Sequence, residues 1–405
     1  MVVTEKLDNG IRIVQEHIPG ARSVSIGIWI LAGSRNEERH HGISHLIEHM
    51  MFKGTEKFTA KEIAEAFDSI GGDVNAFTSK EYTSIYATVV DRHAGFAWNV
   101  LSDMFLNSTF DEKELEREKK VIEEEIDMVE DTPDDIIHDY LHDQSFQGHP
   151  LSHSVLGTKE SLANIHRKDI LRYRNQYYVP NRIVISVAGN INQSLIDQMA
   201  ESMSDFPNNE LNDDSLYSAF TPVNYIEEKE ANQAHLCLGF PGVPITDDRI
   251  FAMAILDNII GGSMSSRLFQ EIREERGLAY SVFSYHSTFK DNGLVVLYGG
   301  TNPSQAEEME QVILQVTKDL STKGMTDKEL EQSKEQMKGQ LILGLEHSTS
   351  RMQKNGKTAL LNLLHHTADD LISKVESVTL QDVNELADLI FENDPSRAFI
   401  HPADV

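Results

Sequence analysis

Three things are scarce in this sequence of 405 residues: cysteine, long apolar runs and positive charge. The one cysteine, Cys237, cannot form a disulfide within the chain, and its Leu-Cys-Leu context favours a buried core position over a nucleophile. No stretch approaches the roughly 18 apolar residues of a membrane helix, and the first ten residues lack the basic start and apolar run of a secretory signal. We therefore expect a cytoplasmic protein with no membrane partner.

Basic residues are outnumbered by acidic ones, 36 to 65, which gives a formal net charge of −29. Recognition of nucleic acid begins with a basic patch, so nucleic acid is not an expected partner. The simplest explanation of the acidic surplus is solubility, and the alternative is attraction of basic peptides.

The length exceeds what one hydrophobic core usually supports and favours two domains. Apolar and polar residues alternate as in strands in some segments and follow a helical period in others. The predicted strands cover 11–14, 23–31, 82–90 and 182–188, and the predicted helices cover 60–70, 111–129 and 167–178. A polar Asn/Asp/Ser-rich stretch follows, so we predict one domain over 1–207, a linker over 208–222 and a second domain over 223–405.

Two short segments of the first half recur in the second. Lys-Glu-Leu-Glu at 113–116 returns at 328–331, and residues 70–77 can be aligned with 275–282, each time where a helix ends and a strand begins. These matches favour a duplication, and chance similarity between helical segments is the alternative.

The candidate chemistry lies in His45-Leu-Ile-Glu48-His49. Residues three and four apart share a helix face, so both imidazoles can reach one ion beside Glu48. Two such nitrogens and one carboxylate suit zinc and leave a fourth position for water, whose proton a carboxylate can take. This is the inverted form of the H-E-x-x-H motif, and an accidental match is the alternative until a third ligand is found.

The acidic helix predicted over 111–129 offers that ligand. Its apolar stripe consists of Leu115, Ile122, Ile126 and Val129. Glu118 and Glu125 fall on or beside this stripe, where a carboxylate is costly unless it is paired or bound to metal. Glu125 is therefore the candidate ligand, and Glu118 is a second carboxylate of interest.

Several motifs together resemble the pitrilysin/insulinase family of inverted zinc metallopeptidases, and most closely the processing-peptidase β subunits and their bacterial relatives. The resemblance is carried by the inverted motif and by the segments 71–78, 118–125, 177–181, 187–190, 261–270 and 276–281.

The resemblance implies an α+β fold of two homologous domains, each a mostly antiparallel sheet packed with helices, facing each other in a clamshell. It implies one Zn²⁺ per chain on His45, His49 and Glu125, with Glu48 activating the zinc-bound water and Glu118 orienting a ligand from behind. The implied activity is endopeptidase cleavage of short or unfolded peptides in a chamber, and the implied assembly is a homodimer.

The resemblance also implies substrate-binding positions. Asn75, Ala76, Phe77 and Thr78 match the edge strand that pairs with an extended peptide, and without the family they indicate only a strand after a Gly-Gly turn. Arg273 and Tyr280 match a pair in the second domain that binds substrate and steadies the oxyanion, in cis or in trans; alone they would indicate packing.

The second half lacks the metal set. Alignment of the repeat places Glu48-His49 on Asp257-Asn258 and Glu125 on Gln340, so only the first domain is expected to be catalytic. The alternative function is a non-catalytic peptide-binding or assembly subunit of the same fold. The complete set of His45, Glu48, His49 and Glu125 favours the active peptidase.

Overall fold

The computed structural model describes residues 2–207, 209, 211 and 220–403. These residues form two compact units, each built from both halves of the sequence. Unit 1 contains the described residues of 1–126, 153–215 and 343–367, and unit 2 contains those of 127–152, 216–342 and 368–405. The linker predicted for 208–222 lies mostly outside the described residues.

Unit 1 is built on a six-stranded sheet with the order β1-β2-β6-β3-β5-β4. The strands are β1 (Val2–Lys6), β2 (Arg12–His17), β3 (Ser23–Ile30), β4 (Asp73–Thr78), β5 (Thr83–Val90) and β6 (Ile183–Gly189). All neighbours are antiparallel except β2 and β6, and β4 is an edge strand.

Unit 2 is built on a five-stranded sheet with the order β7-β11-β8-β10-β9. The strands are β7 (Asn224–Lys229), β8 (Ala234–Gly242), β9 (Ala279–Thr288), β10 (Gly293–Thr301) and β11 (Ser396–Pro402). The one parallel pair, β7 with β11, occupies the same place as β2 with β6 in the first sheet. This shared order agrees with the duplication, and the two-domain α+β prediction with mostly antiparallel sheets is confirmed.

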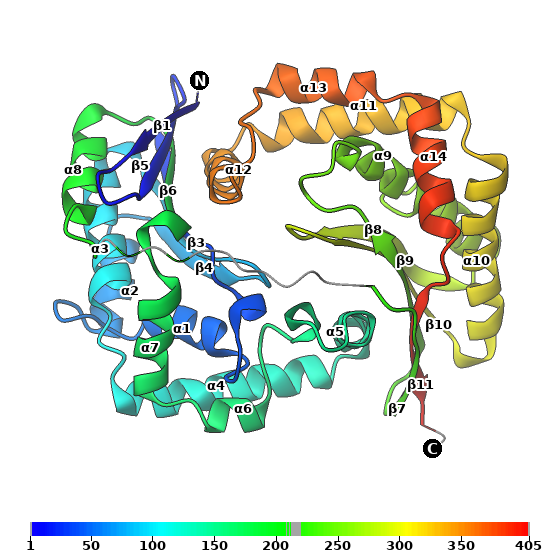
Figure 1. Cartoon of the computed structure of the whole chain (residues 1–405), viewed down its shortest axis with the longest axis horizontal. Helices are drawn as coiled ribbons and strands as arrows, with labels where there is room; N and C mark the ends of the chain where they lie inside the picture. Colours follow the sequence, from blue (N-terminus) through cyan, green and yellow to red (C-terminus); the bar gives the residue numbers. More distant parts are fainter. Residues whose placement is uncertain (1, 208, 210, 212–219, 404–405) are drawn as a thin grey trace. The chain divides into compact units, whose positions relative to one another are not determined.

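Each sheet of unit 1 and unit 2 is buried on both faces. In unit 1, helices α1 (Ile43–Met51) and α3 (Ala94–Asn107) cover one face, and α12 (Ser348–Leu360) covers the other, where it contacts β2, β3 and β6 (Figure 1). The two faces alternate along β3, because Ile26 and Ile28 belong to the core beneath α1 and α3, whereas Trp29 packs with Met352 of α12.

Unit 2 repeats these layers with a helix from the other half of the chain. Helices α10 (Ala306–Lys323) and α14 (Leu380–Phe391) cover one face, and α5 (Pro133–Ser145) covers the other, against β8 and β11 (Figure 1). Cys237 lies on the α5 face with no exposed surface, as predicted, and burial raises the pKa of its thiol. The two repeats thus exchange one helix: α5 belongs to unit 2 and α12 to unit 1.

The remaining helices complete the two units. They are α2 (Ala60–Asp68), α4 (Glu112–Glu130), α6 (Lys159–Ala163), α7 (Arg167–Tyr177), α8 (Gln193–Met203), α9 (Ile250–Ile260), α11 (Asp327–Gly344) and α13 (Ala368–Ser377). The predicted strands and helices correspond to β2, β3, β5, β6, α2, α4 and α7, with ends shifted by a few residues.

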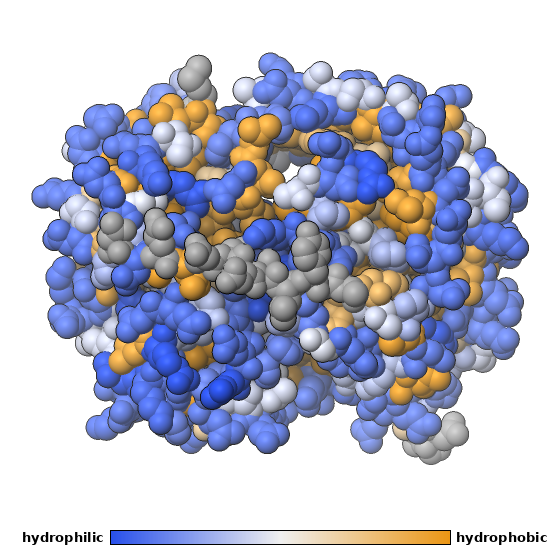
Figure 2. All heavy atoms as spheres, in the orientation of Figure 1, coloured by the Kyte–Doolittle hydropathy of each residue, from blue (hydrophilic) through white to orange (hydrophobic). Residues whose placement is uncertain are grey.

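Hydrophilic residues dominate the face drawn in Figure 2, with apolar residues scattered among them. No helix in the described part of the chain combines the length and the apolar character that crossing a membrane requires.

Candidate metal centre

Helix α1 contains the inverted motif, and its first turn is stabilised by hydrogen bonds. Its apolar residues Ile43, Leu46, Ile47, Met50 and Met51 recur at helical spacing and are buried, which leaves the imidazoles and Glu48 on another face.

The first turn of α1 is capped by Glu37. Its buried carboxylate accepts the backbone N–H groups of Gly42, at 2.7 Å, and of Ser44, at 2.9 Å. Gly42 has a φ of 90°, and a side chain there would press its Cβ against the carbonyl oxygen of Leu156 at 2.5 Å. Burial raises the pKa of Glu37 to about 7, although the two N–H groups oppose that shift.

Three predicted ligands come together in unit 1. Glu125 of α4 places Oε2 3.8 Å from Nε2 of His45 and 3.7 Å from Nε2 of His49. The candidate ligand atoms of these three residues all lie within 4.8 Å of one another. Ligand atoms of a tetrahedral zinc site with bonds of about 2.0–2.1 Å are about 3.4 Å apart, so this set fits zinc closely.

The protonation states also suit a metal. Burial, with His49 nearby, lowers the pKa of His45 to about 4, so this imidazole is neutral near pH 7. Nδ1 of His45 is buried with no hydrogen-bond partner among the described residues, which is consistent with a ring oriented through Nε2. Nδ1 of His49 lies 3.1 Å from Oε2 of Glu118, and a proton shared there leaves Nε2 of His49 free to bind.

Glu48 lies beside the ligand set and is 9% exposed. The hydroxyl of Thr78 donates to its Oε2 at 2.5 Å. Burial raises the pKa of Glu48, while the Thr78 bond and His49 act against the shift. A carboxylate with a raised pKa is better suited to accept a proton and pass it on.

Glu118 lies deep in unit 1, with a side chain only 6% exposed, and it bonds on two sides. Oε2 faces His49, and Oε1 lies 2.7 Å from Nζ of Lys53. Lys53 was not predicted from the sequence; its position four residues after His49, just beyond the end of α1, was the available signal.

The strand predicted to bind substrate is β4, which includes Asn75, Ala76, Phe77 and Thr78. Only β5 pairs with it among the described strands, so its other edge is available for a further strand. The Thr78–Glu48 bond ties this strand to the motif helix.

Arg273 and Tyr280 lie together in unit 2. Arg273 belongs to the π-helix Phe269–Glu275, a form often found at functional sites, and Tyr280 belongs to β9. The guanidinium lies 4.4 Å from the centre of the Tyr280 ring and donates to the Tyr280 carbonyl at 3.0 Å. The phenol is 78% exposed.

Helix α9 and strand β9 of unit 2 repeat the arrangement of helix α1 and strand β4 but lack the candidate metal ligands. Asp257 of α9 accepts a hydrogen bond from the hydroxyl of Ser284 of β9 at 2.6 Å, as Glu48 does from Thr78. In the same register, Ala254 and Asn258 stand where His45 and His49 do.

Comparisons with known proteins give matches over nearly the whole chain. The family model described as "Insulinase (Peptidase family M16)" matches residues 12–159, and the model described as "Peptidase M16 inactive domain" matches residues 164–337. The chain is 48% identical over 404 residues to a Bacillus subtilis protein named "Uncharacterized zinc protease YmxG", covering 100% of this chain and 99% of that one. It is 37% identical to a Streptomyces coelicolor protein named "Uncharacterized zinc protease SCO5738", covering 98% of this chain and 88% of that one.

Solved structures share the fold. A protease from Helicobacter pylori superposes with a TM-score of 0.93 at 21% identity and covers 99% of both chains. A peptidase M16 inactive domain from Pseudomonas fluorescens gives a TM-score of 0.93 at 19% identity and covers 100% of this chain and 99% of that one.

Proposed function

Because this chain belongs to the insulinase family (peptidase family M16), we propose that it is a zinc-dependent endopeptidase. The observation that carries the proposal is the convergence of His45, His49 and Glu125 in unit 1 with Glu48 beside them. The relatives YmxG and SCO5738 are named zinc proteases, which supports both the metal and the reaction class.

Each residue at the site has a distinct task. His45, His49 and Glu125 would hold one zinc ion, which when bound supplies the Lewis acidity that activates water and polarises a carbonyl. Glu48 takes the proton of the attacking water and later delivers it to the leaving amine. Thr78 fixes the carboxylate of Glu48 through its 2.5 Å hydrogen bond.

The free edge of β4 supports an extended peptide as substrate. Its N–H and C=O groups can pair with a peptide backbone, which short and unfolded peptides offer and folded proteins seldom do. Arg273 and Tyr280 would bind the substrate and donate to the developing oxyanion. A homodimer and a cytoplasmic location stay predictions.

A mixed-peptide digest read by mass spectrometry tests the function. Wild-type protein with one equivalent of zinc should cut extended peptides, a chelator should stop the cleavage, and added zinc should restore it. Protein that binds no zinc and cuts no peptide would contradict the proposal and favour a non-catalytic peptide-binding subunit.

A further inference from the structure

We propose that Lys53 is a positioning residue of the metal centre, which acts through Glu118 to orient His49. The proposal deepens the proposed function, since it concerns the same zinc site. Its first basis is a continuous contact: Nζ of Lys53 lies 2.7 Å from Oε1 of Glu118, and Oε2 of Glu118 lies 3.1 Å from Nδ1 of His49.

Burial makes this contact consequential. The Glu118 side chain is 6% exposed, so water solvates its charge poorly and the groups bonded to it must stabilise that charge. The Lys53 side chain is 30% exposed and keeps part of its stem and head in solvent. With Lys53 on one oxygen, the other oxygen is fixed in the direction of His49, whose Nε2 then faces Glu125.

Charge balance points the same way. Two carboxylates, those of Glu118 and Glu125, lie against the ring of His49, and the ammonium of Lys53 is bonded to the more buried one. Without Lys53 the site would carry an uncompensated negative charge in a poorly solvated place.

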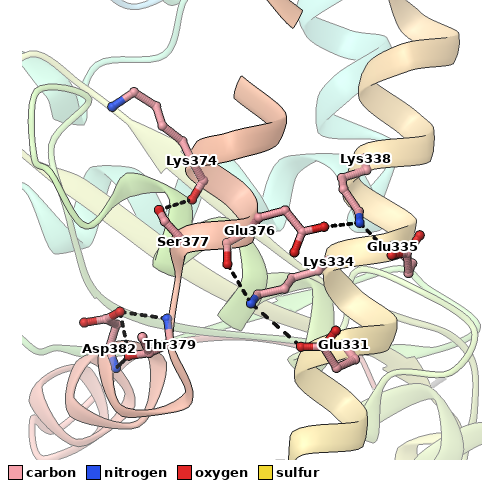
Figure 3. A network of polar contacts seen from close by, with 9 residues as sticks. All are labelled: Glu331, Lys334, Glu335, Lys338, Lys374, Glu376, Ser377, Thr379 and Asp382. Atoms are coloured by element: carbon pink, nitrogen blue, oxygen red, sulfur yellow. Dashed lines mark hydrogen bonds and ion pairs between the residues drawn. The ribbon is translucent and has the colours of Figure 1, made fainter. Parts of the chain in front are cut away.

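Comparison of the two repeats distinguishes Lys53 from lysines that only stabilise the fold. Helix α4 and helix α11 each carry a nearly buried lysine paired three residues back, Lys119 with Glu116 at 2.8 Å and Lys334 with Glu331 at 3.8 Å. Figure 3 shows that Lys334 also bonds the backbone carbonyl of Glu376, so this lysine fastens α11 to α13.

In contrast, unit 2 lacks all three residues of the Lys53–Glu118–His49 contact. At the aligned positions Gly262 replaces Lys53, Ser333 replaces Glu118 and Asn258 replaces His49. Both repeats therefore have the helix lysine, as Lys119 and Lys334. Only unit 1, which holds the candidate metal ligands, has the lysine that contacts Glu118. This pattern indicates that Lys53 serves the metal centre rather than the fold.

The test is the zinc affinity of the full chain, measured by competition with a chromogenic chelator. Lys53→Met keeps the apolar stem and removes the charge, and it should weaken zinc binding about 10-fold or more, the range typical of partners behind a metal ligand. Lys53→Arg keeps the charge and should restore affinity to within about 3-fold of wild type.

Lys57→Met is the matched control. Lys57 follows the same helix and pairs at 3.2 Å with Asp103, whose side chain is 3% exposed, but neither residue bonds to the metal set. It should alter thermal unfolding of the metal-free protein and leave zinc affinity unchanged.

A double-mutant cycle tests whether Lys53 affects zinc binding through Glu118. In a Glu118→Gln background, Lys53→Met should weaken zinc binding by less than about 2-fold, because its partner is already neutral. Equal affinities for Lys53→Met and Lys57→Met, or an undiminished effect in Glu118→Gln, overturn the proposal. If Lys53→Met does not fold, Lys53→Gln is read in its place with the same expectations. A wild type that binds no zinc overturns the proposed function as well, whereas zinc binding without peptide cleavage overturns only the enzyme assignment.

Discussion

Helix α1 of unit 1 and helix α9 of unit 2 occupy equivalent places against sheets of the same order, yet they carry different groups. Each helix holds a carboxylate, the buried Glu48 or the half-buried Asp257, that accepts a hydroxyl hydrogen bond from the neighbouring strand, and desolvation raises the pKa of both. That carboxylate–hydroxyl pair is therefore a property of the fold. The proposed chemistry depends on the two imidazoles, on Glu125 and on the contact of Glu118 with His49.

The largest expected difference between the two units concerns their carboxylates. Glu48→Gln should reduce peptide cleavage by about a thousandfold or more with zinc content unchanged, because it removes the base and keeps the ligands. Asp257→Asn should change cleavage by less than about twofold. Turnover of a fluorogenic peptide and metal analysis check both variants, and equal losses would end the distinction between the units.

The caps of the two helices should respond oppositely to pH. The raised pKa of Glu37 means that its protonated form favours the fold: a stabilisation of at most about 3 kcal/mol is present below pH 4.5 and lost as pH rises to about 7. Asp247, which bonds the backbone N–H of Arg249 next to α9, has a pKa lowered by the Arg249 side chain, so its contribution is lost only as pH falls through that lowered pKa.

Denaturant unfolding of metal-free wild type and Glu37→Gln across pH 5–7.5 checks this expectation. The difference in the free energy of unfolding should shrink as pH rises. Parallel curves would show that Glu37 is ionised in the fold throughout.

Glu125→Gln should weaken zinc binding about a hundredfold, because a neutral amide replaces an anionic ligand. The reciprocal change, Gln340→Glu in unit 2, should create no second zinc site, since Ala254 and Asn258 supply no imidazole. Chelator competition and metal stoichiometry measure both. Unchanged affinity in Glu125→Gln would remove Glu125 from the ligand set.

Tyr280→Phe tests whether unit 2 takes part in catalysis. The ring remains for Arg273 to stack on, at 4.4 Å, and only the hydroxyl is lost. We expect turnover to fall about tenfold with zinc content unchanged, which is less than the roughly 10²–10³-fold loss of a main oxyanion donor because Arg273 remains. Normal turnover in this variant would contradict a role for the Tyr280 hydroxyl of unit 2 in catalysis.

The smallest expected effect concerns the exchanged helices. A Cβ on Gly356 of α12 would overlap the indole of Trp29, whereas a Cβ on Gly239 of β8 would meet only the end of the Leu141 side chain of α5, at 3.1–3.3 Å. Gly356→Ala should therefore cost about 1–2 kcal/mol in the free energy of unfolding, and Gly239→Ala about 0.5 kcal/mol or less. Denaturant titrations followed by tryptophan emission measure both, and equal costs would contradict the difference in packing.

Four strands and three helices of the first half could be predicted from the sequence because they depend on local period, whereas the meeting of Glu125 with His45 and His49 also needed the family resemblance. Alternation in β3 and β5 and the stripe of α4 identified their elements, and the stripe placed Glu118 correctly on the buried face. Glu125, which lies beside the stripe, is more exposed, 34% at its side chain.

Other features depend on tertiary choice. The period of α5 and α12 shows an apolar face and says nothing of which sheet it covers, so the exchange of helices could not be predicted. The contact of Lys53 with Glu118 joins residues 65 positions apart, and no spacing rule links them.

The exchanged helix α12 has a consequence for how the protein is made. His45 and Glu125 leave the ribosome early, but the sheet that supports them is covered on its second face only by residues 348–360. A nascent chain therefore carries the candidate ligands His45, His49 and Glu125 long before Trp29, Val14 and Val184 gain their covering helix. We expect unit 1 to reach its final packing only after residues 348–360 have been synthesised.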